Sequence, residues 1–352
     1  MARINYDLSN DIVNDTQKVV TSTWTNNTNE LTGVFTSSLQ AVATAATSKG
    51  AFFVEVYNEV TSSTSAAVQY AVAYGHKAGS GSLDFTNDTN ALGNSPSKVI
   101  YNQYRQLVFG DETQQFSFPG DGGTDAYTPD DIYVININRA RYKNNLKPGT
   151  LNLKLSSSAH DTARVGLIEL TDDSITSTGS AVITNAGRQF NLVSGSSGVR
   201  SGSLNIQVAT SGSYGLYYPD SGFIILNPAA VGHHISGTLP GVASHTSETN
   251  QHKLVTAISG GNSFIIDSEE KISSKYYFTR IKNSEFNFTT NPSFIDNSGN
   301  LRYTTMENNP KVYITTVGLY NDTDDLVAVA KLSQPIAKDF SKEALIRVKL
   351  DY

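Results

Sequence analysis

Cysteine is absent from this chain of 352 residues. Disulfide bonds and thiolate zinc sites are therefore excluded. Charge is also scarce, because 26 Lys and Arg and 32 Asp and Glu make up only 16% of the residues and leave a formal net charge of -6. Since no block of basic residues is present to attract phosphates, we expect no nucleic-acid partner.

Long apolar runs are missing as well. No uninterrupted stretch approaches the roughly 18 residues that a membrane-spanning helix needs. The first residues, MARINYDLSNDIVNDTQ, lack the basic start and the apolar core of a signal peptide. We therefore expect no insertion into a membrane.

Uncharged polar residues are abundant instead, together with 18 Tyr and 15 Phe. Ser, Thr and Asn side chains compete with the helical backbone for hydrogen bonds, so their abundance favours strands and turns. The aromatic side chains supply large apolar areas for a core. The composition predicts a mainly β fold with few helices, and not a disordered chain.

Local patterns place the individual elements. Pro96 in a first turn and Gly110 at the end predict a helix from Asn94 to Phe109. Residues 232–252 are expected to form a loop-rich excursion, and a short helix is expected near 39–47. Strands are predicted at 52–57, 67–74, 132–139, 151–155, 165–170, 203–208, 222–226, 255–258 and 275–282.

These elements suggest three parts. Residues 1–50 are expected to form an extended N-terminal arm that becomes ordered on a neighbouring subunit. Residues 51–150 and 263–352 are expected to form one discontinuous, β-sandwich-like body. Residues 151–262 are expected to form a β-rich insertion domain within it.

The last forty residues carry the clearest strand pattern. Two apolar strands flank a polar turn at 321–325, and Ile346 and Val348 alternate with charged residues in a third strand. That alternation predicts one buried face and one wet face. The continuous apolar run 327–330 predicts a strand that is covered on both faces.

Several residue groups could carry chemistry, but each has a simpler structural interpretation. Two Ser-x-x-Lys sequences, at 95–98 and 268–271, have the spacing of a serine acylase, yet no Lys-Thr-Gly follows them and a helix cap explains the first. A histidine-rich stretch could bind zinc or iron, but it contains no helical ligand pair, and solvated loop histidines are favoured. Its members are His233, His234, His245 and His252, with Glu248 nearby.

Carboxylates are interpreted in the same way. Asn321, Thr323 and Asp325 imitate the start of a calcium loop, but Leu326 stands where an EF-hand needs glycine. Turn formation explains that segment and the acidic loop of Asp121, Asp125, Asp130 and Asp131. A glycosidase pair could come from Glu55, Glu59, Glu169, Asp172 and Asp173, although exposed strand ends and turns are the expected alternative. We expect no catalytic residue, no metal and no cofactor.

Aromatic and apolar side chains near turns are the candidate interface residues. Trp24 lies in the expected arm, where docking on its own domain is an equal alternative. The tyrosines of SYGLYYPDSG suit protein or sugar contacts, although packing in a β core is favoured. The candidates are Trp24, Tyr214, Tyr217, Tyr218, Leu319 and Tyr320.

The segment GLYNDTDDLVAVAKLSQP (318–335) resembles a "GLYD…G.L.AVAK" hairpin of tail-fibre attachment and baseplate proteins of tailed bacteriophages. Residues 276–302 look like the segment that precedes this hairpin in structural proteins of contractile-tailed phages. The resemblance implies a β-rich subunit of the baseplate, neck or fibre-attachment apparatus, present in symmetric copies. Because the chain has no repetitive shaft and carries the hairpin near its C-terminal end, a compact baseplate or connector component is favoured.

The resulting hypothesis is a non-enzymatic virion protein, made in the cytoplasm of the bacterial host and built into the phage tail. Its expected partners are other tail, baseplate or neck proteins and copies of itself. A receptor- or carbohydrate-binding tail fibre or tailspike protein, with 151–262 as the binding module, is the second hypothesis. A tailspike that degrades polysaccharide is the third.

Overall fold

The computed structural model describes residues 4–37, 53–81, 96–119, 126–156, 167–175, 181–201, 212–234, 250–289 and 291–352. Within these ranges the fold is mainly β, as the composition predicts. Its α-helices in the described part are α1 (Pro96–Phe109), α3 (Pro228–His234) and α4 (Asn250–Gly261). The described helices are not long and apolar enough to span a bilayer.

The chain forms two compact units, which we call the large unit and the terminal unit. The large unit comprises Val19–Glu270. The terminal unit comprises Met1–Lys18 and Lys271–Tyr352. The chain passes from one unit to the other within two strands, β1 (Ile12–Ser22) and β15 (Asp267–Ile281).

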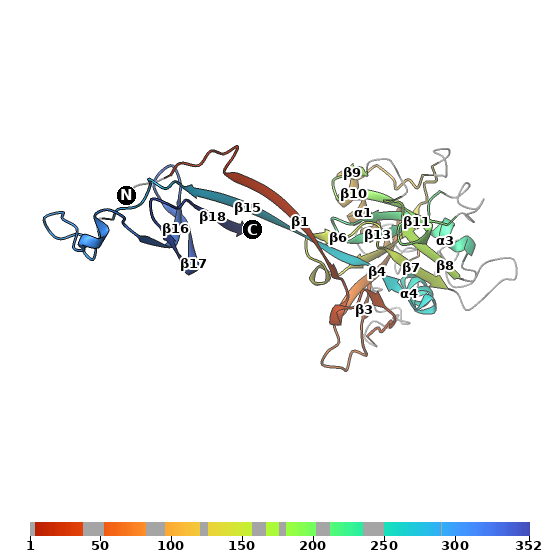
Figure 1. Ribbon diagram of the computed structural model, residues 1–352. Coiled ribbons are helices and arrows are strands. Elements are labelled where there is room, and N and C mark those ends of the chain that lie inside the picture. Colours follow the sequence, from red (N-terminus) through yellow and green to blue (C-terminus); the bar gives the residue numbers. More distant parts are fainter. Residues whose placement is uncertain are drawn as a thin grey trace. The chain divides into compact units, whose positions relative to one another are not determined.

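One antiparallel sheet dominates the large unit (Figure 1). β9 (Val182–Thr184) and β11 (Val199–Arg200) pair with β10 beside its main path. In spatial order that path is β2 (Glu30–Leu31), β14 (Phe264–Ile265), β7 (Asn152–Ser156), β8 (Leu167–Asp172), β10 (Gly187–Ser196), β12 (Gly215–Tyr218), β13 (Phe223–Leu226), β5 (Asp131–Ile137), β4 (Val68–His76) and β3 (Phe53–Tyr57). A separate short strand, β6 (Asn145–Leu146), pairs with β15 at 268–269.

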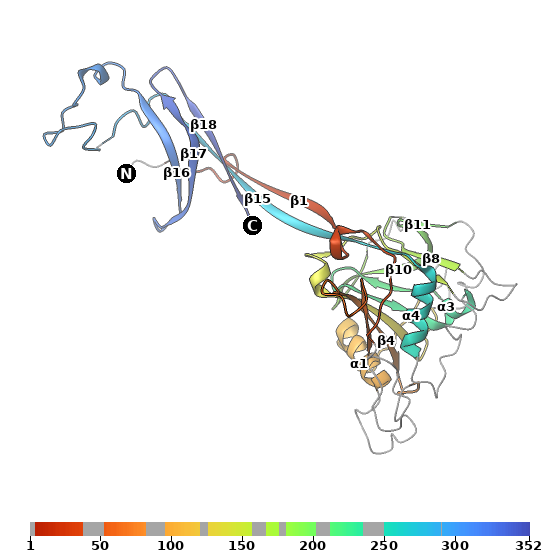
Figure 2. The ribbon, with the colours of Figure 1, turned by 90° about the horizontal axis from the view of Figure 1, so that it is seen from below.

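Both faces of this sheet are covered, because alternate residues of one strand enter different cores. In β5, Tyr133 and Ile135 belong to the core that contains α4, whereas Ile132 and Val134 belong to the core that contains α1. The two helices therefore lie on opposite faces of the sheet, and Figure 2 shows them apart. This double coverage explains why central strands such as β13 are buried along their whole length.

The sheet also curls until its ends meet. Phe264 in β14 and Tyr70 in β4 are far apart in strand order, yet their ring centroids lie 5.4 Å apart. Trp24 packs on both rings, and its indole nitrogen donates to the carbonyl oxygen of Phe264 at 2.8 Å. Phe35, just after β2, exchanges both backbone hydrogen bonds with Tyr57 of β3. The two end strands of the path are thereby joined.

The terminal unit is sandwich-like, with two thin layers around a small core. One layer is β1, β15 and β18 (Ala344–Asp351), and the other is the hairpin of β16 (Val312–Tyr320) and β17 (Leu326–Lys338). The buried residues between them are Ile281, Leu319, Ala344, Ile346 and Val348. The charged residues between the apolar positions of β18 are exposed, which confirms the predicted alternation.

The observed units differ from the expected arm, body and insertion. β5, from the expected body, pairs with β13, from the expected insertion, so these two parts share one sheet. The arm is not separate either, because Trp24 and Leu31 are buried in the large unit and β1 pairs in a sheet. Local sequence patterns do not reveal these contacts, because the strands that pair lie far apart along the chain.

Two element predictions were wrong. Residues 250–261 form helix α4, not a loop and a strand, because Leu254, Val255, Ala257 and Ile258 line one helical face that fills the curled sheet. The run 327–330 is covered on one face alone, since Val327 is 67% and Val329 58% exposed. The strand predicted at 203–208 and the helix predicted near 39–47 lie outside the described residues.

Candidate functional site

The hairpin β16–β17 in the terminal unit has two unlike faces. Its inner face carries Leu319, Ala328 and Ala330, which pack against the small core. Its outer face carries apolar side chains that the described residues leave open: Tyr320 is 41%, Leu326 52% and Val329 58% exposed. Apolar groups collected on an open face are typical of contact surfaces.

The backbone of the hairpin fixes this outer face. Leu319 pairs with Ala328 and Tyr320 with Leu326, so Val327 is the extra residue of a β-bulge. Gly318 lies under the cluster, because a Cβ atom there would come within 3.1 Å of the Tyr320 ring and 3.2 Å of the Leu326 side chain. Tyr320 and Leu326 therefore lie together over the glycine.

The turn at 321–325 is held by its own side chains. The Asn321 side-chain oxygen accepts from the backbone nitrogens of Thr323 at 3.1 Å and Asp325 at 2.7 Å. The Asp325 carboxylate accepts from the Thr323 hydroxyl at 2.7 Å and from the Asn321 amide at 3.2 Å. These hydrogen bonds, that of Thr323 first, hold the pKa of Asp325 below its usual range. The turn therefore keeps its negative charge in a fixed position.

Charge is ordered along the outer face. The acidic turn carries Asp322, Asp324 and Asp325, and the apolar cluster follows it. Lys331 comes next, two residues beyond Val329 on the same face of β17, and it is exposed. We call this strip of acidic, apolar and basic groups, from Gly318 to Lys331, the outer hairpin face.

The opposite outer surface of the terminal unit is polar. Tyr276 of β15 pairs with Lys349 of β18. The guanidinium of Arg347 lies 5.3 Å and the ammonium of Lys349 5.9 Å from the centre of the Tyr276 ring. Lys349 also contacts Asp351 at 3.0 Å. The charged groups of Arg347 and Lys349 on this sheet face therefore contact neighbouring side chains of the same unit.

The predicted interface residues are distributed differently from the expectation. Trp24 is 2% exposed, and Tyr214, Tyr217 and Tyr218 are fully buried in the cores of the large unit. Burial raises the pKa of Tyr217 well above its ordinary value. These four side chains occupy core positions, which was the favoured interpretation for the three tyrosines and an equal alternative for Trp24. Leu319 faces inward, while Tyr320 belongs to the outer hairpin face.

Two residues of the outer hairpin face, Val329 and Lys331, were not predicted from the sequence. The alternation of Ala and Val along β17, which places the small side chains inside, was nevertheless visible there.

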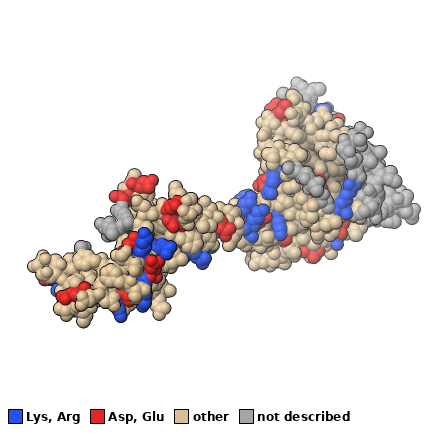
Figure 3. Space-filling model, turned by 45° about the horizontal axis from the view of Figure 1, so that its top comes forward, with Lys and Arg blue, Asp and Glu red and all other residues tan. Residues whose placement is uncertain are grey.

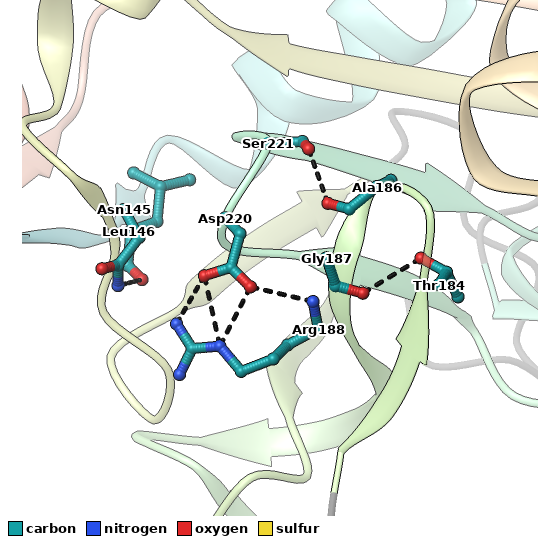
Figure 4. A network of polar contacts seen from close by, with 8 residues as sticks. All are labelled: Asn145, Leu146, Thr184, Ala186, Gly187, Arg188, Asp220 and Ser221. Carbon is teal, nitrogen blue, oxygen red and sulfur yellow. Dashed lines mark hydrogen bonds and ion pairs between the residues drawn. The ribbon is translucent and has the colours of Figure 1, made fainter.

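A polar network of the large unit joins two neighbouring turns (Figure 4). Arg188, at the start of β10, donates to Asp220 from Nη2 at 2.6 Å and from its backbone nitrogen at 2.8 Å. A Cβ atom on Gly187 would come within 2.7 Å of Asp220, so glycine is required there. Ser221 adds a hydrogen bond of 2.6 Å to the Ala186 carbonyl oxygen. The network fixes the β12–β13 turn and has a structural role.

Four of the five carboxylates considered for a catalytic pair have structural partners, namely Glu55, Glu59, Asp172 and Asp173. Glu55 accepts from the Tyr57 hydroxyl, and Glu59 accepts from the hydroxyls of the turn at 63–65. Asp172 is buried and accepts from the backbone nitrogen of Gly149 at 2.9 Å, and burial raises its pKa. Asp173 accepts from the backbone and side chain of Asn191.

The structure also places the second Ser-x-x-Lys sequence and part of the candidate metal ligands. Ser268 and Lys271 stand three residues apart in strand β15, so they point to opposite faces and do not form a nucleophile and base. Ser95, His245, Glu248, Asp121 and Asp125 lie outside the described residues. Within the described ranges, no group of three or more His, Asp or Glu residues could hold a metal ion.

The large unit contains an open depression, and charge is scattered over the face that Figure 3 shows. One open depression in the large unit is lined by residues such as Val34, Ser156 and Ser259, without a charged group among its lining residues. The face in Figure 3 is mostly neither acidic nor basic, and its charged residues form small groups. Comparison with protein-family models, with curated proteins and with solved structures found no match.

Proposed function

We propose that the protein is a non-enzymatic structural subunit of a bacteriophage tail, which joins copies of itself to other tail, baseplate or neck proteins. It is made in the cytoplasm of the bacterial host and resides in the virion. The outer hairpin face is the observation that carries this proposal. A two-stranded hairpin covered on one face is marginal by itself, and its exposed apolar side chains suit a permanent contact.

Two further features support an assembly role. The outer hairpin face lies within the segment 318–335 that resembles the hairpin of phage attachment and baseplate proteins. The aromatic side chains proposed for sugar contacts are buried in the large unit, which leaves the carbohydrate-binding alternative without its expected platform. Of the carboxylates considered for a glycosidase, Glu59 holds a turn and Asp172 is buried, so these two give the enzyme alternative no support.

The test is the location of the chain in purified particles of the phage that encodes it. Mass spectrometry of gradient-purified virions is expected to detect the chain in a fixed ratio to other tail proteins. Immunogold labelling is expected to mark the tail or its junction with the head. Virions that lack the chain, while the host cytoplasm contains it, would contradict the proposal.

A further inference from the structure

The order of groups on the outer hairpin face makes this face complementary to itself. The acidic turn stands at one end, the apolar cluster lies in the middle, and Lys331 stands at the other end. If a second copy is turned by a two-fold axis that lies between the faces and across the strands, the acidic end of each copy meets the basic end of the other. The apolar middle of each copy then covers that of its partner.

From this arrangement we propose that the outer hairpin face is a two-fold contact between two copies of the chain. The contact deepens the proposed function by naming one partner, and it rests on that function only for its role in a particle. Val329 and Leu326 form its apolar centre, and Lys331 faces Asp322 of the partner at both ends.

The spacing along the strand fits this arrangement. From Asp322 to Lys331 the chain crosses the turn and then runs along β17, and the apolar cluster separates the two charges. Strand geometry places Leu326 and Lys331 about 17 Å apart, which is long enough for Leu326, Val327 and Val329 to lie between the two charged ends. The inner alanines let β17 approach the core closely, so the larger valines are left to the outer face.

Like charges would meet in the alternative, parallel arrangement. There the acidic turns would lie side by side, and so would the two copies of Lys331, which is unfavourable. The charges therefore select the antiparallel orientation. The apolar middle supplies most of the attraction, because exposed ion pairs contribute little by themselves.

The size of the face sets the expected affinity. The paired part of the hairpin is about 30 Å long and about 10 Å wide, which is smaller than a standard interface. The contact is therefore weak and depends on concentration. In a symmetric particle, several such contacts act together and raise the effective affinity.

Sedimentation velocity of the purified full chain from about 2 to about 200 µM tests the contact. A shift from monomer to dimer with rising concentration is expected. Val329→Asp places a charge in the apolar centre and is expected to weaken the dimer at least about tenfold. Leu345→Asp is the matched control: Leu345 is a 66% exposed strand residue of the same unit on the other layer, and the variant is expected to dimerise as the unaltered chain does.

A charge exchange gives the sharper test. Lys331→Asp and Asp322→Lys are each expected to weaken the dimer about three- to tenfold, because each brings like charges together. The double variant is expected to return to within about threefold of the unaltered chain, since the opposite charges again meet. The turn is kept in these variants, because the side chains that hold it are those of Asn321, Thr323 and Asp325.

Three outcomes overturn the inference. They are a chain that stays monomeric at about 200 µM, a dimer that Val329→Asp weakens no more than Leu345→Asp does, and a double variant that is weaker than both single variants. Circular dichroism and melting curves verify that every variant is folded. The proposed function fails separately, when virions lack the chain, even if the purified chain dimerises.

Discussion

Trp24, Tyr70 and Phe264 pack ring against ring inside the large unit, whereas Tyr313 and Tyr352 of the terminal unit are 65% and 71% exposed. The large unit closes its sheet, covers both faces with helices and buries its aromatic side chains. The terminal unit has two thin layers and a core of few residues. The large unit therefore buries its apolar side chains within itself, while the terminal unit leaves more of its own exposed on the described surface.

Trp24→Ala is expected to destabilise the protein more than any other single substitution proposed below. It removes the indole that joins β14 to β4 and leaves a cavity, so the free energy of unfolding of the large unit is expected to fall by about 3–5 kcal/mol. Urea unfolding followed by circular dichroism measures this. Tyr313→Ala in the terminal unit is the control, with an expected change within about 0.5 kcal/mol. Equal effects of both changes would remove the contrast between the units.

Ile346→Ala tests the small core. Ile346 is 4% exposed, and its loss is expected to cost about 2 kcal/mol, the low end for such a change, because a thin core can partly collapse around the gap. Hydrogen exchange of the amides in β15 and β18 measures the local loss. Leu345→Ala, the next residue of the same strand, is 66% exposed and is expected to change the exchange little. A reversed ranking would show that the layers pack differently.

Replacing arginine by lysine in two different ion pairs, Arg188–Asp220 and Arg280–Glu343, compares a half-buried pair with an exposed one. The side chains of Arg188 and Asp220 are 29% and 34% exposed and form several hydrogen bonds, so the loss of the planar fork is expected to cost about 1 kcal/mol. Arg280→Lys is the matched change, because the Arg280 side chain is 70% exposed and makes one contact with Glu343. Its expected cost is below about 0.5 kcal/mol. Thermal melting of both variants gives the ranking.

Two carboxyl groups, one in each unit, are expected to change the stability of the protein in opposite directions as the pH falls. Burial raises the pKa of Asp172 above its ordinary value of 3.8, so the folded large unit binds this proton more tightly than the unfolded chain. The stabilisation by Asp172 is therefore present below pH 3.8 and is lost as pH rises through the raised pKa.

Asp325 in the terminal unit behaves in the opposite way. Hydrogen bonds lower its pKa, so its stabilisation is present above pH 3.8 and is lost as pH falls through the lowered value. Asp172→Asn and Asp325→Asn, compared with the unaltered chain by unfolding from about pH 2 to about pH 7, are expected to remove contributions of opposite sign. The same sign for both changes would contradict this account.

Local patterns predicted the elements whose signals lie within a few residues. The helix predicted at 94–109 is α1 at 96–109, and the strand predicted at 132–139 is β5 at 131–137. The terminal hairpin follows the predicted strand, turn and strand. In each case periodicity and turn residues agree, so local preference and tertiary packing point to the same structure.

The remainder depends on contacts that no short pattern contains. Val255 and Ile258 have β-branched side chains that suggested a strand, but they lie in helix α4 and pack into the core inside the curled sheet. Trp24 is buried because it packs against Phe264, which lies 240 residues away in the sequence. In the candidate site, the sequence indicated Tyr320 but not the side of the hairpin that would be open, since this depends on which face packs against Ile346 and Val348.

The hydrogen bond from Trp24 to the carbonyl oxygen of Phe264 joins residues 240 positions apart. It can therefore form only late in the synthesis of the chain. A ribosome that adds about 5–20 residues per second needs about 12–48 s to pass from the first of these residues to the second. During that time β3, β4 and β5 have left the ribosome, while the strand and helix that complete their enclosure do not yet exist. The core around Trp24 can therefore close only late in synthesis, after Phe264 has left the ribosome.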